Sequence, residues 1–232
     1  MAKFTSHIVT GASGSVGGTT YAKNRNGMYL RAKTAPTQPR TAAQDTVRAS
    51  FAGSAQAWRG LSETQRAGWH ALGAQVTTTD GLGQSSTLTG SQMHLALNGV
   101  LATTGAAPIS DAPSQPEILA ALPTVTLEAA RAGTAAGAFS LFVRSAAYAG
   151  KVQVYATPAV SAGRNYFGKA SFRLLEVVDG LLNGGTALTD AYIAKYGTPV
   201  LGAKIAVKLV PVSPSGFKGA KYHATAIVSV GS

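Results

Sequence analysis

The sequence predicts an α+β protein in which an extended N-terminal arm and a small helical hairpin module precede an antiparallel β-sandwich. Three observations predict this order. Residues 1–40 are rich in glycine and polar residues without helical periodicity, residues 41–105 carry apolar residues at helical spacing, and residues 124–232 alternate apolar and polar residues. Four prolines fall within residues 106–123, which we therefore expect to be the linker.

The arm is expected to contain short strands and to become ordered against a partner subunit. A segment of this length and composition buries little apolar surface by itself. Its tyrosines and basic residues alternate with small polar residues, which fits an arm that binds nucleic acid and equally a strand added to a neighbour's sheet, with charge-assisted bonds to acidic neighbours. The arm residues that we expect at this interface are Arg25, Tyr29, Arg31, Lys33 and Arg40.

Two capping boxes predict the start of two helices. Thr41 and Gln44 have the required spacing, and Ser62 and Gln65 repeat it. Apolar residues then recur at helical spacing, so the two helices should form a hairpin. The aromatic residues expected to form its core are Phe51, Trp58 and Trp69. Two arginines are expected at the interface of this module with a partner, Arg48 and Arg66.

A β-hairpin and a third helix should complete the module. The threonine-rich segment from Gln75 to Leu88 contains Asp80-Gly81, which tolerates the backbone conformation of a tight turn. Thr89 can cap the next helix, and Gly105 is a plausible end for it.

Six or seven short strands separated by glycine, proline and serine are expected in residues 124–232. Their number and spacing predict a sandwich that is fibronectin-like or immunoglobulin-like in outline. One short helix, from Thr189 to about Tyr196 with Gly197 as its end, should lie between strands.

The sequence offers little that could support catalysis. It has no cysteine, its four histidines are scattered without ligand-like spacing, and its nine acidic residues form no evident pair. The glycine-rich stretch from Val9 to Gly17 is similar to a dinucleotide-binding turn, but it lacks a buried strand before it, an apolar helix after it and an acidic residue near position 30. We therefore expect no catalytic residue, no metal site and no cofactor.

Charge is distributed unevenly along the chain. The net charge is +11, and the basic excess lies in residues 1–70 and 151–232. These basic ends fit either weak contact with DNA phosphates, or solubility and docking on an acidic protein surface. The absence of a run of five basic residues favours the second interpretation. Neither a secretory signal nor a membrane span is expected, so the protein should be made in the cytoplasm in soluble form.

Several short stretches carry a family resemblance: Arg48–Phe51, Trp58–Leu61, Gln65–Trp69, Leu88–Gly90, Leu188–Tyr192 and Gly202–Ile205. With the basic arm, they make most of the chain similar to uncharacterised structural proteins of tailed bacteriophages and prophages. The resemblance implies a non-enzymatic virion protein. It does not indicate whether the protein is located in the capsid, the neck or the tail of the particle.

The expected function combines this resemblance with the predicted organisation. The first hypothesis is a capsid-associated or head-decorating protein that forms a homo-oligomer and contacts other virion proteins through its arm and helical module. A tail or head-to-tail component is the alternative of the same class. A host-adhesion module that binds a surface glycan or protein is another, for which exposed aromatic residues would be needed: Tyr148, Tyr155, Tyr166 and Phe167.

Overall fold

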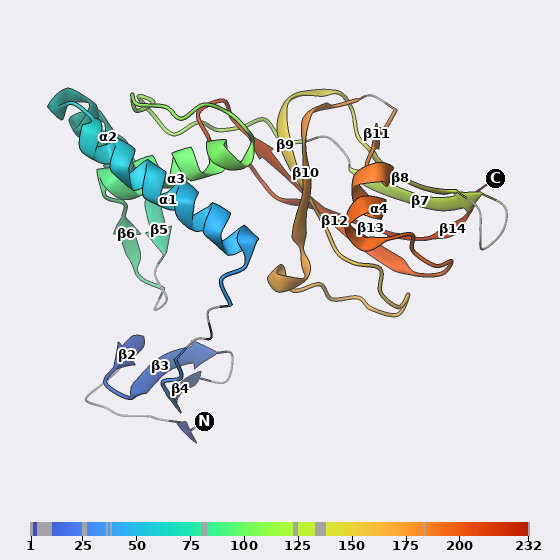
Figure 1. The fold of residues 1–232 in the computed structure, drawn as a ribbon, viewed down its shortest axis with the longest axis horizontal. Coiled ribbons are helices and arrows are strands. Elements are labelled where there is room, and N and C mark those ends of the chain that lie inside the picture. Colours follow the sequence, from blue (N-terminus) through green and yellow to red (C-terminus); the bar gives the residue numbers. More distant parts are fainter. Residues whose placement is uncertain are drawn as a thin grey trace. The chain divides into compact units, whose positions relative to one another are not determined.

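The computed structural model describes residues 2–3, 11–24, 27–35, 37, 39–79, 83–122, 125–132, 138–182 and 184–231. It is a mixed α+β structure, with a small N-terminal sheet, then helices, then further β-sheets (Figure 1). By internal contacts the chain divides into two compact units. The first comprises residues 1–96 and 110–116, and the second comprises residues 97–109 and 117–232.

The N-terminal arm forms a four-stranded antiparallel sheet in the order β1-β4-β3-β2. Its strands are β1 (Ala2–Lys3), β2 (Gly14–Val16), β3 (Thr19–Asn24) and β4 (Gly27–Ala32). Gly17, in the turn between β2 and β3, has φ of 54°, a conformation that glycine adopts without strain. None of the described side chains of β2, β3 and β4 is buried, so these three strands form no hydrophobic core among their described residues.

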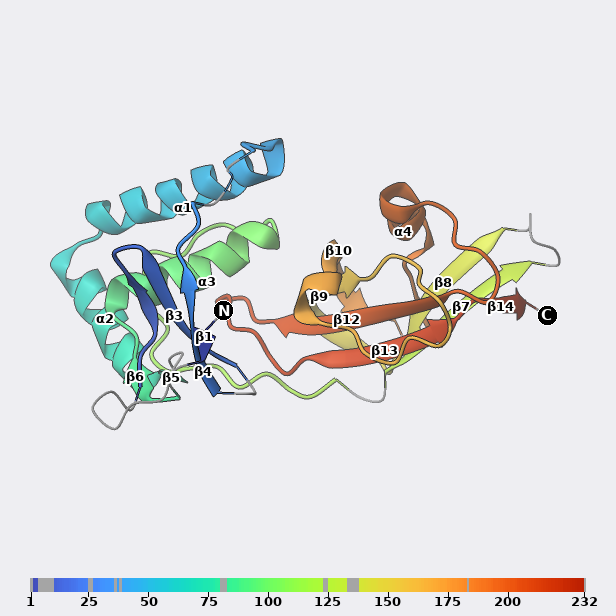
Figure 2. The ribbon, with the colours of Figure 1, turned by 90° about the horizontal axis from the view of Figure 1, so that it is seen from below.

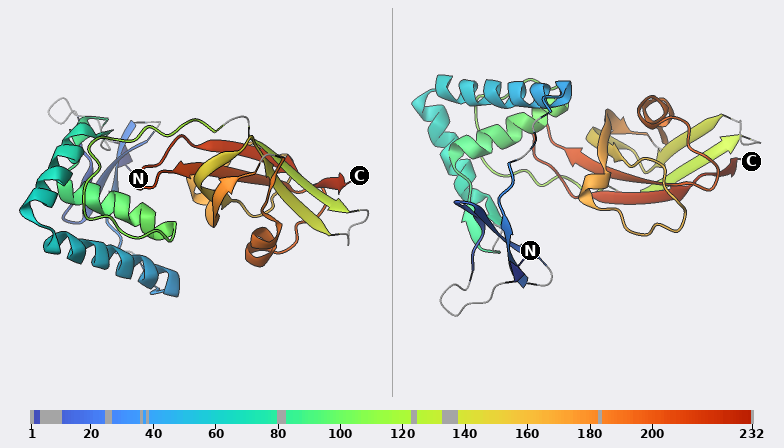
Figure 3. Two further views of the ribbon diagram at one scale, coloured as in Figure 1. Left: turned by 90° about the horizontal axis from the view of Figure 1, so that it is seen from above. Right: turned by 60° about the horizontal axis from the view of Figure 1, so that its bottom comes forward.

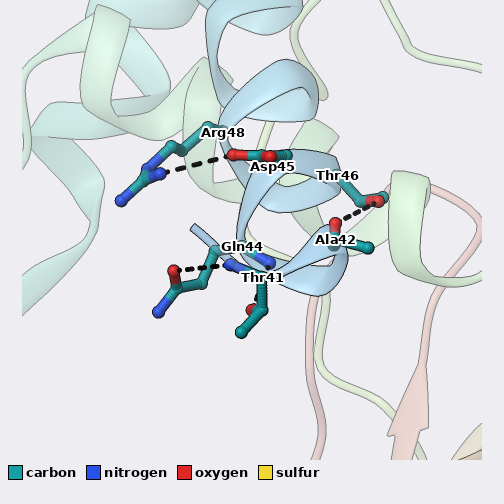
Figure 4. A network of polar contacts seen from close by, with 6 residues as sticks. All are labelled: Thr41, Ala42, Gln44, Asp45, Thr46 and Arg48. Atoms are coloured by element: carbon teal, nitrogen blue, oxygen red, sulfur yellow. Dashed lines mark hydrogen bonds and ion pairs between the residues drawn. The ribbon is translucent and has the colours of Figure 1, made fainter. Parts of the chain in front are cut away.

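Both predicted capping boxes are formed, at the start of α1 (Ala42–Gly60) and of α2 (Glu63–Gln75). Figure 4 shows the first: the Thr41 hydroxyl accepts a hydrogen bond from the Gln44 backbone, and the Gln44 side chain accepts one from the Thr41 backbone. In the next turns, the Thr46 hydroxyl donates a hydrogen bond to the Ala42 carbonyl, and the Arg48 guanidinium donates one to the Asp45 carboxylate. These contacts are local, and α1 contains no buried residue.

A short hairpin and a third helix follow. Strands β5 (Thr77–Thr79) and β6 (Ser85–Thr87) pair in antiparallel register, and the Asp80-Gly81 turn between them lies outside the described residues. Thr89 then caps α3 (Gly90–Thr103), because its hydroxyl accepts a hydrogen bond from the Gln92 backbone, and the Gln92 side chain accepts one from the Thr89 backbone.

The residues of the predicted linker bond back to these helices. The Asn98 side chain exchanges two hydrogen bonds with the Ile109 backbone, and Trp69 donates one to the Ser110 carbonyl. Residues 106–123 are accordingly shared between the two compact units.

The second unit contains two four-stranded sheets. One has the order β10-β9-β12-β13 and the other β11-β8-β7-β14 (Figures 1 and 2). Their strands are β7 (Thr126–Ala132), β8 (Phe139–Arg144), β9 (Tyr148–Ala156), β10 (Arg173–Leu181), β11 (Thr186–Ala187), β12 (Lys204–Val212), β13 (Tyr222–Ile227) and β14 (Ser229–Gly231). One pairing departs from the antiparallel arrangement that we predicted, because β14 runs parallel to β7.

One hydrophobic core is shared by the two sheets. Leu127, Leu141 and Val143 from one sheet pack in the same cluster as Val154 and Ile205 from the other. Successive residues of β12 alternate between this core and the opposite face of their sheet, as the pleat requires.

A short helix, α4 (Thr189–Tyr196), follows β11 and precedes β12 in the chain. It packs against this core and is visible beside the sheets in Figure 3. Tyr192 anchors it, since its ring is fully buried and its hydroxyl donates to the Thr157 carbonyl. Gly197 follows with φ of 77° and ends the helix, as its left-handed conformation favours.

Candidate functional surfaces

The arm residues expected at an interface lie on or next to the N-terminal sheet. Tyr29 and Arg31 occupy alternate positions of β4, and therefore one face of the sheet, opposite Ala22 and Thr20 of β3. Tyr29 is half-buried, whereas Arg31, Lys33 and Arg40 are exposed. Within the described part of the chain these three cations form no ion pair. Arg25 lies outside the described residues.

Phe51 does not belong to a core, which corrects the prediction made from helical spacing. Its side chain is 63% exposed, and Val47, one turn earlier, is 69% exposed. The spacing is helical, but among the described residues the aromatic contacts of α1 are made by Trp58 near its C-terminal end, and the first part of the stripe is left exposed. Arg48 on the same helix is paired with Asp45 at 3.4 Å, and both are well exposed.

A buried aromatic cluster joins the three helices. Trp69 of α2 is fully buried, and its ring meets His94 of α3 edge-on with centroids 5.1 Å apart. Half-buried Trp58 of α1 lies 5.6 Å from His94 and 5.9 Å from His70. The two tryptophans therefore connect the helices and do not form an open stacking platform.

Two polar atoms in this helical region are buried without a partner. His94 is 1% exposed, its Nδ1 makes no hydrogen bond, and burial lowers the pKa of its imidazole. Arg66 donates through one guanidinium nitrogen to the Arg59 carbonyl at 2.9 Å, but its Nε is buried and unbonded.

A second surface gathers basic and aromatic side chains on the outer face of the β10-β9-β12-β13 sheet. Strand register places Leu174, Tyr155, Lys208 and His223 side by side in one row across four strands. The Lys208 ammonium lies 4.2 Å from the centre of the Tyr155 ring and 5.1 Å from that of Phe172. The Phe172 ring in turn meets His223 edge-on at 5.4 Å.

The charged residues that act on Lys208 and His223 are cations. The pKa of Lys208 is lowered first by burial and then by repulsion from Lys221 and Lys218. The pKa of His223 is lowered by burial, Lys208 and Lys221. Burial is the larger cause of each shift, and the neighbouring cations lower the pKa further.

A pocket of about 210 Å³ lies at one end of this sheet, and Phe167 in its lining lies 6.3 Å from Phe172, measured between ring centres. Its lining includes two arginines, Arg164 and Arg173, together with the hydroxyl-bearing residues Thr157, Ser171 and Tyr196. Arg164 is held in place, because its guanidinium lies 5.4 Å from the centre of the Phe167 ring and its Nε donates to the Tyr166 carbonyl. No carboxylate lines the pocket.

The four aromatic residues considered for adhesion differ in exposure. Tyr166 is 80% exposed, while Tyr148, Tyr155 and Phe167 are partly buried. Only Phe167 of the four lines the pocket. The aromatic surface is thus smaller than the sequence suggested.

Arrangements typical of catalysis are scarce in the described residues. They contain no group of three or more histidines and carboxylates placed to hold a metal ion. Asp190 lies close enough to Glu176 to raise the pKa of that carboxyl, although burial is the larger cause. The glycine-rich stretch continues into strand β2 and a turn to β3, whereas a phosphate-binding turn requires a helix there.

No described helix is long and apolar enough to span a membrane.

Comparisons with known proteins give no relative to argue from. No family model, no curated protein and no solved structure matches the chain.

Proposed function

We propose that this chain is a non-enzymatic structural subunit of a tailed-bacteriophage particle, capsid-associated or decorating the head, which assembles through its arm and helical module. The observation that carries the proposal is the N-terminal sheet, in which no described side chain of β2, β3 or β4 is buried. An isolated sheet of this size needs a packed apolar face to be stable. A neighbouring subunit or shell protein would supply that packing.

Helix α1 supports the same proposal. Val47 and Phe51 lie four residues apart on one face of α1, and both are well exposed. An apolar stripe of this kind is typical of a helix that docks into a partner's groove. Arg31, Lys33 and Arg40 would add charge-assisted bonds to acidic neighbours.

We further propose that the second unit is an immunoglobulin-like or fibronectin-like sandwich. Its strand order supports this, because β10-β9-β12-β13 matches the order C′-C-F-G of such domains, while β7, β8 and β11 occupy the places of strands A, B and E. The sandwich would project from the shell or cover it. Its fold alone does not fix a place in the particle.

Light scattering of the purified chain, with and without residues 1–40, tests the proposal. The full chain is expected to be an oligomer, and the truncated chain to be a monomer. Phe51→Ser should also weaken the oligomer. Ile118→Ser is the matched control, since Ile118 is 98% exposed but lies outside the arm and α1. Unchanged mass after truncation would contradict assembly through the arm.

Adhesion is the second candidate, and the exposure of Tyr166 favours it. If the sandwich binds a host glycan or protein, Tyr166→Ala with Phe167→Ala should abolish binding to host cells and leave the oligomer intact.

A tail or head-to-tail component would instead form a closed ring, which native mass spectrometry would reveal as a single fixed stoichiometry.

A further inference from the structure

We infer that the outer face of the β10-β9-β12-β13 sheet and the adjoining pocket bind the phosphodiester backbone of single-stranded nucleic acid. We call this the cationic face, defined by Tyr155, Phe172, Lys208, Lys221 and His223, with Arg164 and Arg173 in the pocket. The inference is independent of the proposed function, because it concerns only the second unit and not the arm or α1.

Uncompensated positive charge is the first argument. Within the described residues no carboxylate lies within ion-pair distance of Lys208, Lys221, Arg164 or Arg173. Of the nearby acids, Asp179 is already paired with Lys151 at 2.8 Å. A bound polyanion would relieve the repulsion between these cations and release counterions.

The spacing of the cations is the second argument. Lys204 and Lys208 lie on the same face of β12, four residues apart, which places their backbones about 13 Å from each other at the rise of a strand. Arg164 continues the charge, because its guanidinium lies 5.4 Å from the centre of the Phe167 ring, which in turn lies 6.3 Å from the Phe172 ring beside Lys208. The cations therefore form a track that can follow a chain of phosphates, whereas a single anion would use only one of them.

Hydroxyl groups and aromatic rings add the third argument. Ser171 gives the pocket a hydroxyl group that accepts a hydrogen bond from the Arg164 guanidinium, and this combination suits a phosphate. Tyr166, 80% exposed beside it, presents a ring on which an unpaired base can stack. A duplex would hide its bases from such a ring, so the geometry favours a single strand over a duplex or an acidic peptide.

The test is fluorescence anisotropy of the full chain with a labelled 20-nucleotide oligothymidine at several salt concentrations. The double variant Arg164→Gln, Lys208→Gln removes two expected phosphate contacts. Its log–log salt slope should become shallower by about 1.4, because each contact on a single strand contributes about 0.7. Affinity at low salt should fall by roughly tenfold or more, and Tyr166→Ala should cost about tenfold through lost stacking.

Arg144→Gln is the matched control, since Arg144 is exposed on β8, in the other sheet of the same unit. It should change affinity less than about twofold, and circular dichroism would verify that each variant is folded. Deletion of residues 1–40 should leave binding unchanged, whatever it does to the oligomer.

Four results would overturn the inference. They are no binding by the full chain, the same salt slope in the double variant, duplex DNA bound as tightly as the single strand, and polyglutamate competing as well as the oligonucleotide. The last would assign the face to an acidic protein. The oligomeric state, measured on the same samples, reports separately on the proposed function.

Discussion

At the scale of single residues, the clearest contrast is between Trp69 and Phe51, which sequence spacing had treated alike. Trp69 is fully buried and donates its indole N–H to the Ser110 carbonyl at 2.8 Å, whereas Phe51 is 63% exposed. Trp69→Ala should lower the free energy of unfolding by about 3–5 kcal/mol, through the cavity and the lost bond. Phe51→Ala should change it by less than about 0.5 kcal/mol.

Urea unfolding of the dilute monomer, followed by circular dichroism, measures both values. Equal losses for the two variants would mean that α1 packs in solution through a face that is exposed in this structure. The comparison is informative because both side chains are large aromatics on neighbouring helices of one unit.

His94 should make the stability of the helical region depend on pH. Burial lowers the pKa of His94 in the folded state below its ordinary value of 6.5, so the unfolded chain binds a proton more readily. The stabilisation is complete above pH 6.5 and is lost as the pH falls from 6.5 to the lowered pKa.

His94→Leu removes the titrating group without orphaning a partner of Nδ1, which makes no hydrogen bond. The variant should lose less stability between pH 7 and pH 5 than the natural chain in the same urea measurement. Parallel curves for the two proteins would show that His94 is not the cause.

At the scale of elements, the two capping boxes provide a matched pair. Ser62 accepts from the Gln65 backbone at 3.2 Å and starts α2, which buries Trp69 and Leu72. Thr41 accepts from Gln44 at 3.4 Å and starts α1, which buries nothing. Ser62→Ala should therefore cost about 1 kcal/mol of global stability.

Thr41→Ala should instead leave the urea midpoint nearly unchanged and speed hydrogen exchange only in the first turns of α1, because those turns open without disturbing a core. A clear shift of the midpoint for Thr41→Ala would indicate that α1 is packed more tightly than its exposure implies.

Elements whose signals are local could be predicted from the sequence. The capping boxes at Thr41 and Ser62 begin helices, and the expected short helix coincides with α4, Thr189–Tyr196. What an element packs against is not local. Val47 and Phe51 have the period of a buried stripe, yet no described segment covers them.

The cationic face could not be predicted for a related reason. Lys208 lies between Tyr155 and His223 only because of the register of β9, β12 and β13, and those residues are far apart in the sequence. The basic excess of residues 151–232 was visible from composition, but its concentration on one face of a sheet depends on the strand pairing. The parallel pairing of β14 with β7 is similarly long-range.

At the scale of the whole molecule, the arm sheet should be stable only when the protein is assembled. Its described side chains are at most half-buried, so in a dilute monomer the backbone bonds between β3 and β4 should open readily. Amides of β3 should therefore exchange quickly in dilute solution and much more slowly at concentrations where the protein is oligomeric.

The core strand β12, buried along most of its length, supplies the internal control, because it should be protected at every concentration. Hydrogen exchange with mass spectrometry across a dilution series measures both segments together. Strong protection of β3 in the monomer would show that the sheet is stable by itself, and the arm would then have no need of a partner.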